Sequence, residues 1–182
     1  NAYGVDIDNH TQSLPNDLYP SAVVNHTGNV KINAQSRDQE AFGVYVHSAK
    51  PNKESGTDQG GAANFSKELN IKAVSANSNA TGIFVSGAPI TDENGEVLFT
   101  SGQASVNTSG DTTIVAAGKT ASYALNAEAD GQITVGSTGK TVHLTGDIVA
   151  KNDGVMNIAG KTNTINGIVK AVDGGTVNLS GA

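Results

Sequence analysis

Apolar and polar residues alternate in short stretches along the whole chain, and clusters of Gly, Asn, Asp and Ser separate these stretches. The triplets Val5-Asp6-Ile7, Val44-Tyr45-Val46 and Ile83-Phe84-Val85 recur about every 39 residues. Alternation with a period of two places neighbouring side chains on opposite faces of a β-strand. The later members of this series are expected to be Tyr123-Ala124-Leu125, Leu144 and Ile165.

A second series of apolar–polar–apolar triplets also predicts strands with one buried face. Its members are Val30-Lys31-Ile32, Leu69-Asn70-Ile71, Ile133-Thr134-Val135, Met156-Asn157-Ile158 and Val177-Asn178-Leu179. The outward residues Thr134, Asn157 and Asn178 should form a polar ladder. Such a ladder would stabilise the stack or bond to a neighbouring β-helix.

The C-terminal part of the chain matches itself at a fixed step of about 21 residues. Residues 139–160 align without a gap on residues 160–181, which places Leu144 on Ile165 and Ile158 on Leu179. Gly-Lys-Thr occurs at the same step three times, starting at positions 118, 139 and 160. A short fixed period indicates stacked units, each unable to bury its apolar face alone.

Strand type and period together predict an all-β fold, a right-handed parallel β-helix (solenoid). We interpret 1–182 as a single fragment with loop-decorated coils over 1–111 and compact coils of about 21 residues over 112–182. Insertions are expected in the N-terminal coils at 8–22, 47–66 and 86–110, where all four prolines lie. In the third insertion, Asn94-Gly95 predicts a small hairpin.

Composition and charge remove several functional classes. The net charge is −6, which argues against nucleic acid and against anionic membrane surfaces as partners. Cysteine is absent, so a thiolate metal site and a Cys nucleophile are excluded. The chain contains no apolar run long enough to cross a bilayer, so we expect no direct membrane insertion by this fragment.

The run from Leu144 to the C-terminus resembles the β-helical passenger region of bacterial autotransporters (type V secretion). The resemblance is carried by Leu144-Thr145-Gly146-Asp147-Ile148 and by the phrase over 174–181. It is clear over about 112–182 and fainter before that. It implies a bacterial cell surface (outer membrane-anchored) or secreted location, with a signal peptide before this piece and more coils and a membrane-embedded domain after it. The family includes adhesins, self-aggregating proteins, proteases and toxins, and no motif here selects one.

Candidate chemistry is sparse. The Gly-Lys-Thr copies lack the preceding Gly of a phosphate-binding loop, so we interpret them as turns between strands. The strand acids Asp6 and Asp147 are far apart in sequence, and Asp92, Glu93 and Glu96 suit a solvated turn, with a weak calcium site as the lesser alternative. We therefore expect no catalytic residue, no metal and no cofactor.

Adhesion is the favoured function, with binding by loops that project from a rigid β-helix. The expected partner is a host surface protein or glycan, the matrix, or another β-helix through self-association. Two alternatives stay open, a polysaccharide-acting β-helix enzyme and a structural spacer stalk without binding activity. The candidate partner-binding residues are Tyr19, Tyr45, His47, Lys53, Phe84, Asp92, Glu93 and Glu96.

Overall fold

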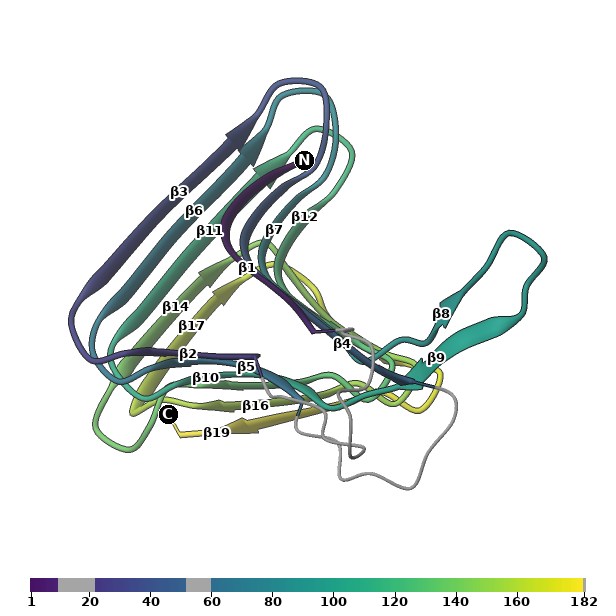
Figure 1. The fold of residues 1–182 in the computed structure, drawn as a ribbon. Coiled ribbons are helices and arrows are strands. Elements are labelled where there is room, and N and C mark those ends of the chain that lie inside the picture. Colours follow the sequence, from purple (N-terminus) through teal and green to yellow (C-terminus); the bar gives the residue numbers. More distant parts are fainter. Residues whose placement is uncertain (10–21, 52–59, 182) are drawn as a thin grey trace.

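The chain folds into long parallel β-sheets that enclose one apolar interior (Figure 1). The computed structural model describes residues 1–9, 22–51 and 60–181, and this part of the chain is all-β and contains no helix. Three sheets form three sides around the interior, and the chain adds one strand to each of them in turn before the order repeats (Figure 1). This arrangement is compatible with a parallel β-helix or solenoid.

We name the sheets by their main features. The bent sheet contains β1 (Ala2–Asn9), β4 (Ala41–Pro51), β7 (Ala80–Ser86), β12 (Ser122–Glu128), β15 (Asp147–Lys151) and β18 (Val169–Val172), joined by β8 (Ile90–Thr91) and β9 (Val97–Ser101). The asparagine sheet contains β2 (Ala22–His26), β5 (Gly61–Phe65), β10 (Ala104–Thr108), β13 (Gln132–Val135), β16 (Val155–Ala159) and β19 (Thr176–Ser180). The third sheet contains β3 (Val30–Ser36), β6 (Leu69–Ser75), β11 (Thr112–Gly118), β14 (Thr141–Thr145) and β17 (Thr162–Asn166).

The pairing predicted from the C-terminal self-match is confirmed. Leu144 is the parallel partner of Ile165, and Ile158 is the partner of Leu179. The same holds for Ile148 with Val169. Equivalent positions of successive coils therefore touch, where a coil is the chain between consecutive strands of one sheet.

Two details of the predicted series were wrong. The second series mixes two sheets, because Val30 and Leu69 begin strands of the third sheet whereas Ile133 belongs to the asparagine sheet. In the first series, the partner of Ile83 is Leu125, so the fourth member is Leu125-Asn126-Ala127. The triplets of different sheets look alike because every strand has one buried face.

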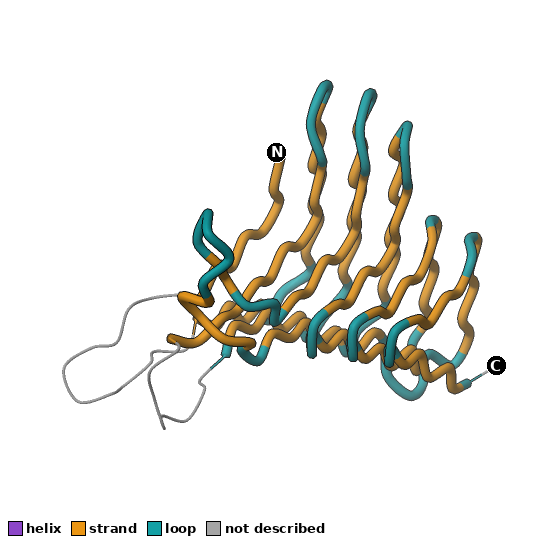
Figure 2. Tube along the Cα trace, turned by 90° about the vertical axis from the view of Figure 1, so that its right-hand side faces the viewer, coloured by secondary structure: helices purple, strands orange, loops and turns teal. Residues whose placement is uncertain are grey.

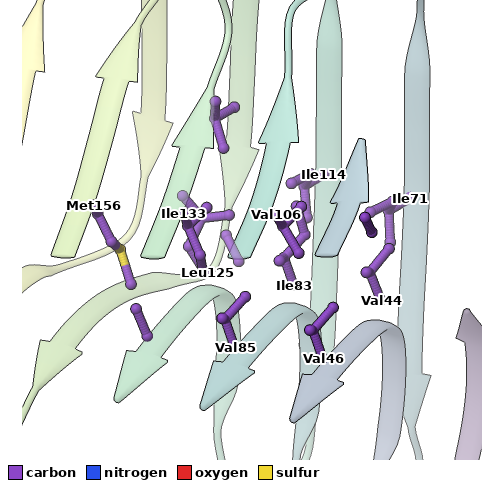
Figure 3. Close-up of a cluster of buried hydrophobic side chains, with 14 of the residues drawn as sticks. Val44, Val46, Ile71, Ile83, Val85, Val106, Ile114, Leu125, Ile133 and Met156 are labelled. Atoms are coloured by element: carbon purple, nitrogen blue, oxygen red, sulfur yellow. The ribbon is translucent and has the colours of Figure 1, made fainter. Parts of the chain in front are cut away.

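The predicted first series is also wrong in its last two members, which belong to a different sheet from the others. Leu144 and Ile165 belong to the third sheet, and the bent sheet continues through Ile148 and Val169 instead. Apolar residues from all three sheets meet in the interior (Figure 3). Ile83, Ile114 and Ile133 are each fully buried, and each such side chain stabilises the fold by about 1.5–3 kcal/mol.

The larger N-terminal coils extend the corner between the third sheet and the bent sheet (Figure 2). Alanines face each other across this corner, and Ala73, Ala80 and Ala116 form a small buried cluster of their own. Small side chains allow the ends of β6 and β11 in the third sheet to lie close to the start of β7 in the bent sheet. β11 and β12 are still joined through this extended corner, so the coil that contains them is longer than the later ones. The regular step of 21 residues between paired strands of the third sheet therefore begins only at β14, which pairs with β17.

The strands of the bent sheet change direction at Gly4, Gly43 and Gly82. A Cβ atom on Gly43 would overlap Ile71 Cγ2 of the third sheet and the Gly82 carbonyl oxygen. Glycine therefore permits the bend to pack directly on the core ladder of the third sheet. This bend turns the outer face of the sheet into a concave surface.

Each coil leaves the bent sheet through one further corner. The insertions predicted for the N-terminal coils fall at this corner in the chain order, but residues 10–21 and 52–59 of them lie outside the described residues. Residues 61–65 and 104–108 of the predicted loops are strands β5 and β10. In the later coils a turn of two residues with positive φ suffices, as at Asn152 and Asp153. The hairpin of β8 and β9 is confirmed, and β9 also pairs antiparallel with the end of β4.

Only two of the three Gly-Lys-Thr copies occupy equivalent places. Thr141 pairs with Thr162, so the second and third copies stack. Gly118 instead ends β11 and pairs with Ser75. The equal spacing of the first copy was therefore misleading, and the repeat does not extend to it.

Candidate functional site

Four aromatic rings gather on the concave outer face of the bent sheet. Tyr3 and Phe42 are parallel partners before the bend, and Tyr45 and Phe84 are partners after it. The rings of Tyr3 and Phe42 stack with centroids 5.4 Å apart, and those of Tyr45 and Phe84 stack at 5.1 Å. The register of a parallel sheet thus produces two ring stacks.

The two stacks pack edge to face across the bend. The ring centroids of Tyr3 and Tyr45 are 5.3 Å apart at 69°, and those of Phe42 and Phe84 are 5.8 Å apart at 65°. Aromatic pairs prefer these two geometries, and each contributes about 0.5–1.5 kcal/mol beyond its buried area. The cluster of Tyr3, Phe42, Tyr45 and Phe84 is therefore a rigid platform.

An open cavity of about 380 Å³ lies over this platform. Its lining continues past the rings to Thr81 on β7 and to Tyr123 and Asn126 on the next strand, β12. No residue of the described part of the three insertions lines it. A second hollow of about 260 Å³ shares Tyr123, Asn126 and Lys151 with the first. The two hollows form a groove along the stack, which we call the ring groove.

Polar groups in the ring groove are mostly paired. Lys151 Nζ lies 2.6 Å from Glu128 Oε2, and Asn79 donates a hydrogen bond of 2.8 Å to Glu40. Asn126 is the exception, since its buried Oδ1 has no hydrogen-bond partner among the described residues. An unpaired buried acceptor carries a desolvation penalty of about 1–3 kcal/mol.

Acidic side chains on β1 adjoin the rings. Asp6 and Asp8 lie on the same face of β1, in register with Tyr45 and His47. Burial, and then the charge of Asp8, raise the pKa of Asp6 above its ordinary value. Burial and then the neighbouring charges, Asp8 first, raise the pKa of Tyr45 to about 12, so its hydroxyl is protonated at neutral pH.

His47 connects the bent sheet with the third insertion. Its Nδ1 lies 3.2 Å from Asp8 Oδ1, and its Nε2 lies 3.0 Å from the carbonyl oxygen of Ala88. The histidine is thereby held on both sides, and it ties the strand that carries Tyr45 to the segment leading into the hairpin. Its position favours a structural role next to the ring groove.

The other candidate residues lie elsewhere. Asp92, Glu93 and Glu96 form the hairpin tip, where Asp92 Oδ1 accepts backbone hydrogen bonds of 2.8 Å from Asn94 and from Glu96. Those backbone bonds, that from Glu96 first, lower the pKa of Asp92. The carboxylate therefore closes its own turn, in agreement with the solvated-turn interpretation. Tyr19 and Lys53 lie outside the described residues.

The predicted polar ladder exists and is longer than expected. On the outer face of the asparagine sheet, Asn64 donates to Asn25 and accepts from Asn107, each at 2.9 Å. Asn178 donates to Asn157 at 2.9 Å, and Thr134 separates these two runs. The amides bond to one another, which favours the stabilising role of the ladder over a contact with another β-helix.

Sequence reasoning found half of the ring platform. It named Tyr45 and Phe84 but not Tyr3, Phe42 or Asn126. The signal for the first two was present, because Ala2-Tyr3-Gly4 and Ala41-Phe42-Gly43 precede the recognised triplets. Asn126 was missed because the fourth triplet was placed two residues too early, which set Ala124 beside Phe84.

No protein-family model, no curated protein and no solved structure matches the chain. Within residues 1–9, 22–51 and 60–181, no three His, Asp or Glu side chains lie close enough together to hold a metal ion. The same residues include no helix of the length and apolarity needed to cross a membrane.

Proposed function

We propose that the chain is a segment of a surface-displayed adhesin, a right-handed parallel β-helix from the passenger region of a bacterial autotransporter. Its partner is a molecule of a host surface, of the matrix or of another bacterium. The sequence phrase shared with such passengers and the parallel register of equivalent residues support the class. The handedness follows the strong general preference of parallel crossovers.

The ring platform is the observation that supports binding. A stiff sheet holds four aromatic rings and an open groove on one outer face. Phe42 is buried beneath the cluster at 7% exposed, whereas Tyr3 is 40% exposed and Tyr45 and Phe84 are partly exposed. Aromatic surface of this kind beside polar groups is typical of recognition sites. The face after the bend makes the contact in this proposal, and the hairpin of β8 and β9, which projects from the end of the bent sheet with Asp92, Glu93 and Glu96 at its tip, is a separate secondary surface (Figure 1).

Adhesion of bacteria that display the chain tests this proposal. We expect Tyr45→Ala combined with Phe84→Ala to reduce attachment to host cells or to sister bacteria at least about tenfold, since two anchor rings are removed. A matched control on another outer face, Thr164→Ala on β17, should leave attachment unchanged. If the double variant is displayed at normal levels and attaches normally, binding through this face is wrong, and a spacer stalk becomes the better interpretation.

A polysaccharide-acting enzyme is a second candidate, and one observation favours it. Asp6 and Asp8 are two residues apart on one strand face, and the charge of Asp8 contributes to the raised pKa of Asp6, so the two carboxyl groups are near each other. Two carboxyl groups about 6.5–9.5 Å apart serve inverting glycosidases, in which one of them has a raised pKa. Release of reducing ends from polysaccharides by the wild-type chain but not by Asp6→Asn or Asp8→Asn would establish the enzyme over the adhesin.

A further inference from the structure

The asparagine ladder coincides with a short recurring motif of the sequence. Asn-x-Ser/Thr, in which x is not proline, is the acceptor tripeptide for sugars attached to the asparagine amide. Four copies of this motif start at residues of the ladder, and register stacks them on the outer face of one sheet. In the whole chain the motif occurs six times, starting at Asn9, Asn25, Asn64, Asn79, Asn107 and Asn178.

The hydroxyl residue of the motif is not needed to build the ladder. Asn157 belongs to the ladder, yet the residue two positions further on is Ala159. Ala159 pairs with Ser180, the hydroxyl residue of the last motif, so alanine and serine occupy equivalent places in the sheet. Ser66 donates a hydrogen bond of 3.1 Å to a backbone carbonyl, but the coil of Ala159 folds without such a bond. Recognition of the tripeptide explains the recurring hydroxyl better than the fold does.

Three of the ladder asparagines are accessible to a modifying enzyme. Asn25, Asn107 and Asn178 are exposed, and so is the hydroxyl residue of each of their motifs. Asn64 is half-buried. Asn79 lies outside the ladder at the extended corner, where it is half-buried and donates to Glu40. The motifs of the ladder are therefore the better acceptors.

The hydrogen bonds of the ladder leave one amide hydrogen of each asparagine for a sugar. Asn64 donates from Nδ2 to Asn25 on one side and accepts at Oδ1 from Asn107 on the other. The N–H group that it uses therefore points away from its own C=O group, as in a trans peptide bond. A sugar on Nδ2 makes the amide secondary, and in the preferred trans form it replaces the other hydrogen, beside Oδ1. Ladder bond and sugar can then coexist on one asparagine.

An open hollow of about 310 Å³ lies beside Asn107. Its lining includes both complete motifs over 64–66 and 107–109, together with Thr134 of the next strand. The asparagine and hydroxyl residues of these motifs are exposed or half-buried. Because Thr134 interrupts the ladder, Asn107 has an asparagine neighbour on one side only. The first sugar on Asn107 therefore has space to lie over Thr134.

The spacing of the strands limits how many asparagines carry a sugar. Adjacent asparagines of the ladder are one strand spacing apart, about 4.8 Å. Sugars on Asn25, Asn64 and Asn107 together would crowd one another. Asn178 has no such competitor on β16, because its partner Asn157 lacks the motif. Asn107 and Asn178 are therefore the preferred positions.

We propose that the asparagine sheet is N-glycosylated, with a sugar on Asn107 and another on Asn178. The donor is a sugar whose anomeric carbon is bonded to a phosphate oxygen, and a separate transferase carries out the transfer. The bond from that carbon to the phosphate oxygen breaks, and a bond from the same carbon to Nδ2 forms. The phosphate leaves with the bonding electron pair, and Nδ2 loses one proton. This modification goes beyond the proposed function and leaves the ring platform, on another sheet, uncovered.

Mass spectrometry of the chain isolated from its natural source tests the proposal. Peptides are fragmented under conditions that keep the sugar on its side chain, so that each modified residue is identified. We expect the mass of at least one hexose or N-acetylhexosamine on Asn107 and on Asn178, and none on Asn157. Absence of sugar from both Asn107 and Asn178, or sugar on Ser and Thr hydroxyl groups alone, overturns the proposal.

Two single changes, expressed in the same source, form a matched pair. Ser109→Ala removes a motif but keeps Asn107 in the ladder, so the sugar on Asn107 should be lost while the melting temperature is maintained. Ala159→Ser completes a motif at Asn157 and should add a sugar there, since a serine already occupies the equivalent place on β19. A sugar that stays on Asn107 after Ser109→Ala contradicts recognition of the tripeptide. So does an Ala159→Ser chain that carries sugar on Asn178 but none on Asn157.

Discussion

The three large N-terminal coils and the compact C-terminal coils use the same three sheets but differ at two corners. In the large coils, β3, β6 and β11 have seven residues and continue into an alanine-lined extension. In the compact coils, β14 and β17 have five residues and pass to the bent sheet within a short turn. The core ladders run through both regions.

This difference shows where the surface of the fold is free to vary. Tyr3, Phe42, Thr81 and Tyr123 lie on the arm of the bent sheet that the extended corner supports. The strand β15 starts at Asp147, the partner of Tyr123, so it has no such arm. The aromatic end of the ring groove is therefore a consequence of the larger coils, whereas the compact coils contribute only its polar end, with Asp147, Lys151 and Lys170.

The variant with the largest expected effect, Ile158→Asp, tests whether the two regions unfold separately. Ile158→Asp buries an unpaired charge, because Ile158 is 1% exposed in the compact region. The change should destabilise these coils by roughly 4 kcal/mol or more. If stability is a sum over neighbouring coils, hydrogen exchange should accelerate in β13, β16 and β19 and much less in β3. Equal acceleration throughout would mean that the two regions form one cooperative unit.

Lys140→Ala is the matched control in the same coils. The ammonium group of Lys140 is 3.8 Å from Asp111 Oδ2, and its side chain is 46% exposed. An exposed ion pair of this kind contributes less than about 1 kcal/mol. A large loss of stability here would show that the turn assignment of the second Gly-Lys-Thr copy is wrong.

The next effect tests the bend on which the ring groove depends. Gly43→Ala should destabilise the large coils by about 1–3 kcal/mol, because the new methyl group overlaps Ile71 and the carbonyl of Gly82. The control Gly28→Ala meets no atom within 4 Å and should be nearly neutral. Urea unfolding measures both changes, and equal midpoints for the two variants would contradict the packing described at the bend.

A smaller effect concerns the asparagine ladder, which spans both regions with one interruption. Asn64→Ala removes two hydrogen bonds, to Asn25 and from Asn107, and should cost about 1 kcal/mol. Thr134→Asn fills the interruption between Asn107 and Asn157 and should stabilise the chain by up to about 1 kcal/mol. Melting temperatures check both, and a destabilised Thr134→Asn would show that the two runs cannot be joined.

The sequence predicted the core ladders well because each strand has its own two-residue alternation. It assigned triplets to the wrong sheet where only register distinguishes them, as with Val30 and Ile133. Strands such as β5 lay within the predicted loops, because Gly61 and two alanines give little apolar signal. Their burial comes from neighbouring coils and is invisible in the local sequence.

The site was harder to predict for the same reason. Tyr45 and Phe84 could be paired from their spacing, yet their contact with Tyr3 and Phe42 depends on the bend at Gly43. A straight strand would keep side chains three positions apart on opposite faces. At the bend, two consecutive residues, Gly43 and Val44, both face the interior. This interruption of the alternation brings Phe42 and Tyr45 to one side of the sheet, with ring centroids 5.3 Å apart.

The smallest effects concern two acids of the large coils and have opposite signs. Asp92 has a lowered pKa in the folded chain, so its stabilising contribution is present above the ordinary value of 3.8 and is lost as the pH falls below it. Asp6 has a raised pKa, so the folded state is favoured below 3.8 and loses this advantage as the pH rises through the higher folded value. Asp92→Asn should therefore lower the urea midpoint at pH 7 more than at pH 3, and Asp6→Asn should raise it more at pH 7 than at pH 3. Changes of the same sign in both variants would contradict this account, because it derives one shift from turn hydrogen bonds and the other from burial beside the rings.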